Sequence, residues 1–145
     1  MTLASDKAKN TRRKGLAGVR EVRKILEANG SRVEGPGYQP LFVKKMIVVH
    51  RDYFGIFDLI SLDVDGVLHG HQVTTSPDHK AEKIREMIEA KVAGTVWVKY
   101  PKKKIGSQST SGWRAWYVFL NGEVADPQDP RLPSHLKRVN LPRLQ

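Results

Sequence analysis

Apolar residues follow helical spacing in two parts of the chain and strand-like patterns in others. The first helical segment carries one stripe of apolar residues, formed by Leu16, Val19, Val22, Ile25 and Leu26. This stripe predicts an amphipathic helix over about 16–29 that packs on a sheet and ends at Gly30. Residues 1–14 are polar and basic without periodicity, so we expect a basic, flexible N-terminal arm there.

The second helical segment follows Ser76-Pro77, which is typical of a helix start because serine caps the first turn and proline fits its first position. We expect this helix to run to about Lys91, with Ile84, Met87 and Ile88 on its buried side.

Runs of β-branched and aromatic residues predict strands over 42–50, 95–100 and 113–120. The last of them closes with the turn Asn121-Gly122. A loop rich in lysine, glycine and serine joins the last two strands, either as a finger along nucleic acid or as a solvated connection. Four prolines after residue 125 predict an extended, basic C-terminal tail over 126–145.

The segment from Tyr53 to Thr75 is the most informative stretch, because it reads as two buried strands joined by a turn at Asp65-Gly66. Tyr53 and Phe54 at its start are expected in the core or in a wall of the site. A three-residue loop closed by Gly66 in the left-handed region pairs Asp58 with Gln72.

Register decides which side chains of this hairpin share a face. In the three-residue register, Asp58, Gln72 and Thr74 project from one side near the open end, since every second residue returns to the same face. A two-residue loop instead sets Asp58 opposite Val73 and turns Gln72 and Thr74 away. The functional interpretation depends on the first register.

The order helix, strand, strand hairpin, helix, strand, strand predicts an α/β fold with a central mixed β-sheet flanked by helices. The 145 residues suffice for one domain, which we place at 15–125 between the arm and the tail.

Charge points to a polyanionic partner. The chain has 25 Lys and Arg against 15 Asp and Glu, a net charge of +10. Clustered basic residues are the electrostatic signature of binding to phosphates, although a ribosomal-type or merely soluble basic protein has a similar balance. The side chains expected to contact a DNA backbone are Arg12, Arg13, Lys14, Lys44, Lys45, Lys102, Lys103 and Lys104.

Composition also excludes several classes of protein. Without cysteine, neither a disulfide framework nor a cysteine-based metal site can form. No apolar run approaches the roughly 20 residues of a membrane span, and the N-terminus is charged instead of apolar. We therefore expect a soluble, intracellular protein of the cytoplasm.

The hairpin carries oxygen ligands that suit a hard divalent cation such as Mg²⁺, with Mn²⁺ as an alternative. Asp58 is the main expected ligand, with the Gln72 side-chain carbonyl and the Val73 backbone carbonyl as neutral ones. Glu21 either leans toward this site from the first helix or faces solvent. The metal would polarise a scissile phosphate and activate the attacking water.

Two other groups of residues leave alternatives open. Lys80 and Lys83 sit in the first turns of the second helix, where they either meet phosphate or pair with neighbouring acidic residues. His69 and His71 alternate on one strand face and could bind zinc, but no third ligand is evident, which favours a core or surface role.

Four segments in order carry a resemblance to a known family. They are Arg12-Arg13-Lys14-Gly15 at the start of the first helix, then FDLISLD, HGHQVTT and GWRAWYVF. Over about residues 12–120 the chain resembles archaeal-type Holliday junction resolvases of the PD-(D/E)XK nuclease superfamily, including phage-encoded relatives. The resemblance implies a restriction-endonuclease-like core and a homodimeric, Mg²⁺-dependent endonuclease that nicks four-way DNA junctions, in the host cytoplasm if phage-encoded.

By position, Asp58 matches the metal-binding aspartate of the family, and Gln72 replaces its second acid. Thr74 stands where the family has a catalytic lysine, so Lys83, or else Lys80, would supply that charge. The first-helix glutamate falls on Val19 when counted without gaps, whereas Glu21 matches a second acidic position. These departures keep a rival open, which is a DNA-binding or packaging protein without catalysis on the same fold.

Overall fold

The computed structural model describes residues 3–42, 46–50, 52–100, 104–105, 108–109 and 112–140. The chain has an α/β fold with a six-stranded mixed sheet flanked by helices, which confirms the predicted fold class. A restriction-endonuclease-like core stays a prediction. By its contacts the chain divides into two compact units, Met1–Val73 and Thr74–Gln145, and each is described by itself.

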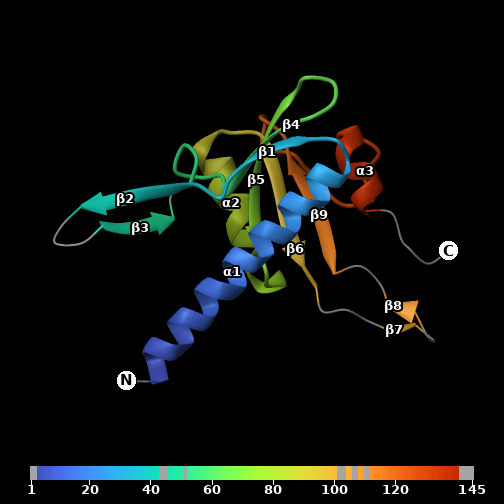
Figure 1. Cartoon of the computed structure of the whole chain (residues 1–145). Helices are drawn as coiled ribbons and strands as arrows, with labels where there is room; N and C mark the ends of the chain where they lie inside the picture. The colour runs from blue at the N-terminus through green and yellow to red at the C-terminus, as the bar shows by residue number, and fades with distance from the viewer. Residues whose placement is uncertain are drawn as a thin grey trace. The chain divides into compact units, whose positions relative to one another are not determined.

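The first unit combines one helix with three strands of the sheet (Figure 1). Its elements are α1 (Leu3–Ala28), β1 (Arg32–Glu34), β4 (Leu59–Leu62) and β5 (Leu68–Thr74). Strand β4 pairs antiparallel with β1 on one side and with β5 on the other. Helix α1 contacts β1 and β4, and Val19, Val22 and Leu26 of the predicted stripe are buried.

Helix α1 begins at Leu3, so the expectation of a non-helical segment over 1–14 is wrong for residues 3–14. The prediction relied on an apolar stripe, which this part of the helix lacks. Alanine, lysine and arginine are nevertheless good helix formers, and they extend a helix whose later turns are held by the core.

A separate hairpin replaces the single strand that was expected over 42–50. Strand β2 (Tyr38–Phe42) pairs antiparallel with β3 (Met46–His50), from Tyr38 opposite His50 to Phe42 opposite Met46. Pro40 lies within β2, and it is tolerated there because both strands of a two-stranded sheet are edge strands, where a missing N–H does no harm. Figure 1 shows this hairpin extending away from β1 and β4.

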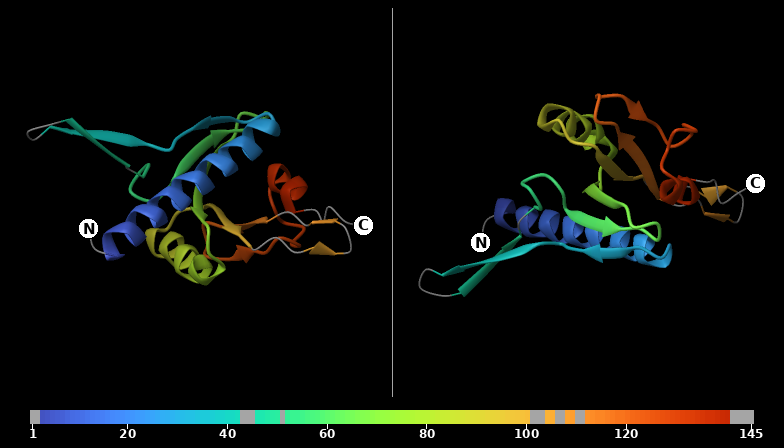
Figure 2. Two further views of the ribbon diagram at one scale, coloured as in Figure 1. Left: turned by 60° about the horizontal axis from the view of Figure 1, so that its bottom comes forward. Right: turned by 90° about the horizontal axis from the view of Figure 1, so that it is seen from above.

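The second unit places helices on both faces of its strands (Figure 2). It contains η1 (Pro77–His79), α2 (Lys80–Ala90), β6 (Gly94–Lys99), β7 (Lys104–Ile105), β8 (Gln108–Ser109), β9 (Trp113–Val118), β10 (Val124–Ala125) and α3 (Ser134–Asn140). Strand β9 pairs antiparallel with both β6 and β10. Residues 94–98 of β6 are all buried, as expected for a strand covered on both faces.

The predicted start of the second helix is confirmed. The Ser76 hydroxyl accepts a hydrogen bond from the Asp78 N–H, and Pro77 occupies the first helical turn. On the buried side, Met87 is fully buried, but Ile88 is 41% exposed and that part of the prediction is wrong. Helix α2 ends at Ala90, so Ile88 lies in its last turn.

Two further expectations fail. The tail is not extended throughout, because α3 forms over Ser134–Asn140 and buries Leu136 against strand β9. Phe54 was expected in the core or in a wall, but its side chain is 88% exposed on a bend where it adopts a φ of 55°. Hydrophobicity alone could not reveal either outcome.

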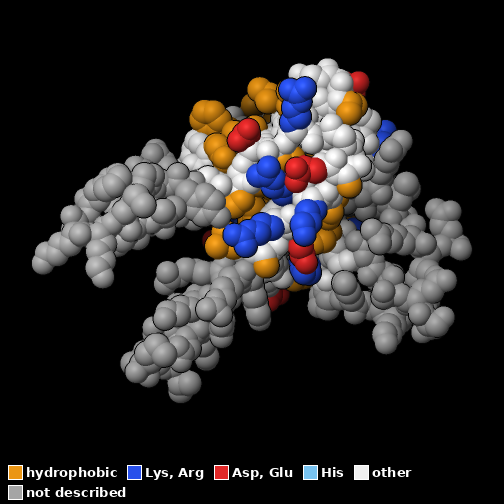
Figure 3. All heavy atoms as spheres, in the orientation of Figure 1, with side chains coloured by type: hydrophobic (Ala, Val, Ile, Leu, Met, Phe, Trp, Pro, Cys, Tyr) orange, Lys and Arg blue, Asp and Glu red, His pale blue; other side chains and the backbone are white. Residues whose placement is uncertain are grey.

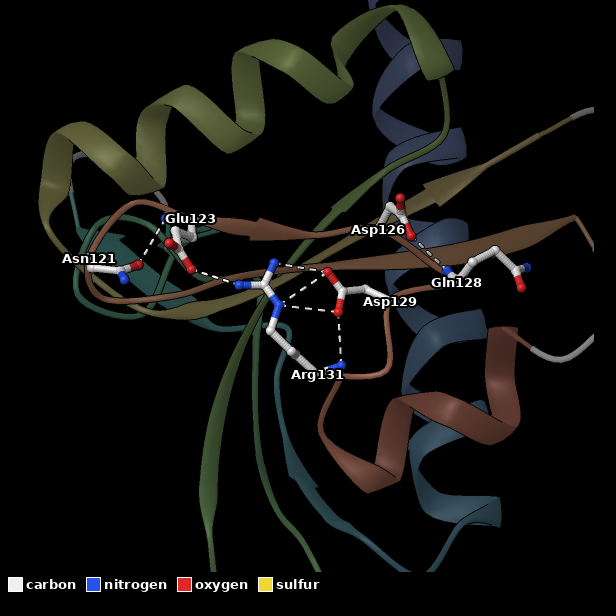
Figure 4. A network of polar contacts seen from close by, with 6 residues as sticks. All are labelled: Asn121, Glu123, Asp126, Gln128, Asp129 and Arg131. Atoms are coloured by element: carbon white, nitrogen blue, oxygen red, sulfur yellow. Dashed lines mark hydrogen bonds and ion pairs between the residues drawn. The ribbon is translucent and has the colours of Figure 1, made fainter.

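Arg131 connects the β9–β10 turn to the segment before α3 (Figure 4). Its guanidinium donates to Glu123 at 2.6 Å and to Asp129 at 2.9 Å, and it lies 5.1 Å from the centre of the Phe119 ring. Both carboxylates raise the pKa of Arg131. The positive charge of Arg131, one of the basic residues of the predicted tail, is thus paired with the carboxylates of Glu123 and Asp129.

Among the described residues, no helix is long and apolar enough to cross a membrane.

Candidate functional site

The β4–β5 hairpin has the three-residue register on which the functional interpretation depends. Leu59 pairs with His71, and Leu62 pairs with Leu68. The Asp63 N–H donates to the Val67 carbonyl at 3.0 Å, which leaves residues 64–66 as the loop. Gly66 has a φ of 82°, the left-handed conformation that this type of loop requires. The three-residue register is therefore confirmed over Leu59–Leu62, and Asp58 immediately precedes this paired segment.

Asp58 closes the open end of this hairpin with both backbone and side chain. Its N–H donates to the His71 carbonyl at 2.8 Å, and its carboxylate Oδ2 accepts from the Val73 N–H at 2.8 Å. The Val73 group in contact with Asp58 is thus the N–H, whereas the sequence pointed to its carbonyl. A carboxylate has two oxygens, so accepting this bond is compatible with binding a metal ion.

Gly35 holds the backbone beside Asp58 and requires the absence of a side chain. It has a φ of 116°, and a Cβ atom there would lie 2.8 Å from the Asp58 carbonyl oxygen. Its own carbonyl accepts a 2.6 Å hydrogen bond from Arg23 of α1. Helix α1 therefore contributes to the position of Asp58 through Arg23.

The polar residues that follow on β5 are buried and bonded within the chain. Gln72 is 3% exposed, and its Nε2 donates to the Ile56 carbonyl at 2.9 Å. Thr74 is 7% exposed, and its hydroxyl both donates to the Ser76 carbonyl and accepts from the Ser76 N–H, at 3.2 Å each. Both side chains thus stabilise the connections around the hairpin, whatever further role they have.

The remaining predicted site residues have local partners of their own. Glu21 is exposed on α1, in agreement with its solvent-facing alternative. Lys80 and Lys83 belong to the second unit. The Lys80 ammonium lies 4.7 Å from the centre of the Trp116 ring, and the Lys83 ammonium lies 3.8 Å from a Glu86 carboxylate oxygen. Lys83 thus has an acidic neighbour of the kind that the pairing alternative expected.

The side chains assigned to DNA contact lie outside the described part of the chain. Arg12, Arg13 and Lys14 belong to α1 and Lys104 to β7, but only their backbone is described. Lys44, Lys45, Lys102 and Lys103 lie outside the described residues altogether. Among the described side chains on the face seen in Figure 3, basic groups lie beside acidic ones.

Asp63 and His69 form a polar pair that the sequence did not reveal. His69 Nε2 lies 2.8 Å from Asp63 Oδ2, and the two side chains are only 8% and 11% exposed. The other oxygen, Asp63 Oδ1, accepts from the N–H groups of Asp65 and Val67 at 2.9 and 3.0 Å. An aspartate just before an Asp-Gly turn is the signal that could have identified this cap.

Carboxylate and imidazole groups are also ligand types for divalent metals, so Asp63 and His69 are candidate metal ligands. His135 is a further candidate ligand of this kind and lies in α3 of the second unit.

His71 forms a second buried polar pair. Its Nε2 lies 2.7 Å from the Ser61 hydroxyl, and both residues are at most 1% exposed. The His69 and His71 rings lie with their centres 6.5 Å apart, as expected for alternate residues on one face of a strand. Each imidazole of this H-x-H sequence thus has its own partner in the hairpin, and His71 with Ser61 has the core role that the sequence favoured.

The Asp63–His69 pair predicts an acid-sensitive contribution to stability. Hydrogen bonds, first from His69 and then from the Val67 N–H, lower the pKa of Asp63 below its ordinary value of 3.8. The ionised carboxylate therefore stabilises the fold above that value, and this stabilisation is lost as the pH falls below about 4.

Urea unfolding between about pH 6 and pH 2.5 tests this expectation. Asp63→Asn keeps the acceptor for the turn, so it should show a smaller loss of stability in acid than the wild type. Asp65→Asn, an exposed change in the same turn, should follow the wild-type curve. Parallel curves for wild type and Asp63→Asn would contradict the assignment.

Comparisons of the chain with protein-family models, curated proteins and solved structures found no match. The resemblance to junction resolvases therefore rests on the sequence segments given above.

Proposed function

We propose that the chain is a structure-specific DNA endonuclease of the Holliday junction resolvase type. The observation that carries this proposal is the position of Asp58 at the open end of the β4–β5 hairpin, where its carboxylate accepts from the N–H of Val73, the neighbour of Gln72. The net charge of +10 supports a polyanionic substrate. Recognition would depend on DNA shape, with basic side chains on the backbone and little reading of bases.

The donor set suits Mg²⁺, with Mn²⁺ as the alternative. Magnesium in proteins is often held by one or two carboxylates together with waters and substrate phosphate, so Asp58 with the Gln72 carbonyl meets the minimum requirement. Bound there, the metal would polarise the scissile phosphate and lower the pKa of the attacking water. Lys83 or Lys80 would supply the positive charge that Thr74 does not. The two protomers of a homodimer would each place one such site on one of two symmetry-related DNA strands.

A second candidate function is DNA binding without catalysis. It is favoured by the hydrogen bonds of Gln72 to Ile56 and of Thr74 to Ser76, since both side chains serve the fold at positions where a nuclease needs catalytic groups. The two functions share the same substrate and differ in metal-dependent cleavage.

The decisive experiment compares a labelled four-way junction with linear duplex of the same sequence, in Mg²⁺, in Mn²⁺ and in EDTA. The nuclease proposal expects paired nicks in the junction with either metal, none in EDTA, and an uncut duplex. Tight junction binding without cleavage in both metals would refute it in favour of the second candidate. Equal cleavage of duplex and junction would contradict structure specificity.

A further inference from the structure

Strands β6 and β9 present two aromatic rings on one face near the start of α2. Val96 pairs with Trp116 and Val98 with Arg114, so Tyr100, two residues beyond Val98, continues the same face. The Tyr100 and Trp116 ring centres are 6.0 Å apart, with an angle of 39° between the planes. The two rings thus form one small aromatic surface.

Trp116 in this surface is more exposed than the other two tryptophans of the chain. Trp97 is 0% and Trp113 is 5% exposed, whereas Trp116 and Tyr100 are both partly exposed. Helix α2, which contacts both strands, begins at Lys80. A partly exposed tryptophan beside a tyrosine offers π-surface to a ligand.

A cation already lies on this surface. The Lys80 ammonium is 4.7 Å from the centre of the Trp116 ring, and Lys80 is the first residue of α2. An exposed cation–π contact is weaker than a base stacked on an aromatic ring. A nucleobase can therefore displace this flexible side chain, whose ammonium then becomes available to the phosphate of the same nucleotide.

We propose that Trp116, Tyr100 and Lys80 bind an unstacked nucleobase of DNA, with the base on the rings and its phosphate on the lysine. The site rests on the proposed DNA-binding function and deepens it, because branch points and unpaired ends are where bases leave the stack. Stacking on aromatic side chains tolerates any base, which suits a protein that recognises DNA by shape.

Fluorescence of 2-aminopurine tests directly whether a base stacks on the aromatic surface of Trp116 and Tyr100. The probes are an oligonucleotide with 2-aminopurine in an unpaired overhang and a blunt duplex with the same base paired. Wild-type protein should quench the unpaired probe on binding and leave the paired one unchanged. Trp116→Leu should weaken binding of the overhang by about 5- to 150-fold, the range for one stacked base, with little change for the duplex.

Two variants control this measurement. Trp116→Phe keeps a ring and should retain most of the affinity and the quenching. Tyr117→Leu removes the neighbouring aromatic residue, which points to the opposite face of β9 and packs edge-on against Phe119 with ring centres 5.0 Å apart. It should bind the overhang like the wild type.

The outcomes separate this proposal from the broader one. The base-binding proposal is refuted if wild-type protein binds the overhang without quenching. It is also refuted if Trp116→Leu binds the overhang as well as Tyr117→Leu does. In both cases the broader proposal of DNA binding stands. If neither overhang nor duplex is bound at low salt, both the proposed DNA-binding function and the base-binding proposal fail. Cleavage is measured separately and does not enter this test.

Discussion

Replacing Asp58 with asparagine is expected to abolish metal-dependent cleavage of a DNA junction while junction binding is retained. Asparagine has the same shape and still offers an oxygen to the Val73 N–H, which the aspartate accepts at 2.8 Å. The hairpin should therefore fold unchanged. The substitution removes the negative charge that holds the cation, and Asp58 is the one carboxylate at the open end of this hairpin in the proposed ligand set.

The expected loss in cleavage rate exceeds about 100-fold, because even a residue that only supports a metal ligand typically contributes 10- to 100-fold. The rate should be measured in single turnover beside the binding affinity. Asp65→Asn is the matched control, since it makes the same charge change in the exposed turn of the same hairpin. Cleavage by Asp58→Asn at the wild-type rate would exclude the proposed metal site.

Glycine to alanine substitutions at two positions should change stability in opposite directions. Gly70 of β5 lies beneath the ring of Phe57, which is only 8% exposed, and a Cβ atom there would approach three ring atoms to 2.6 Å. Gly70→Ala should therefore destabilise the protein by about 1–3 kcal/mol, the usual cost of overpacking. Gly15 lies exposed in α1 with nothing within 4 Å of an added Cβ, so Gly15→Ala should stabilise by about 0.5–1 kcal/mol.

Urea unfolding of each variant measures both changes. A double-mutant cycle identifies the cause at Gly70: Phe57→Leu should reduce the cost of Gly70→Ala, because the smaller side chain leaves room for the new methyl group. If the cost of Gly70→Ala is the same with and without the Phe57 ring, this contact does not explain the glycine.

The elements with strong local signals were predictable from sequence. The position of the β4–β5 turn was specified by Asp65-Gly66, since few residues adopt the left-handed conformation that Gly66 has. The start of the second helix was specified by Ser76-Pro77, whose capping bond involves only neighbouring residues. In both places the chemistry that decides the structure lies within a few residues of chain.

The failures occurred where the outcome depends on distant partners. A single strand was expected over 42–50, but pairing between the segments around Pro40 and Val48 made a two-stranded hairpin. Leu136 lies in a segment rich in proline, yet contact with β9 buries it in a short helix. Local preference is a weak determinant when burial against another element supplies the larger free energy.

The candidate site shows the same division. The Asp-Gly turn left two registers open, and the pairing of Leu59 with His71 selected the one that the interpretation of Asp58 and Gln72 requires. The partners of those side chains came only from the tertiary structure. The bond from the Val73 N–H to Asp58, the Asp63–His69 pair and the contact of Lys80 with Trp116 each join positions that are separated along the chain. Sequence thus determined which residues share a face, since strand periodicity is local, whereas folding decided which groups touch, since that depends on how separate elements pack.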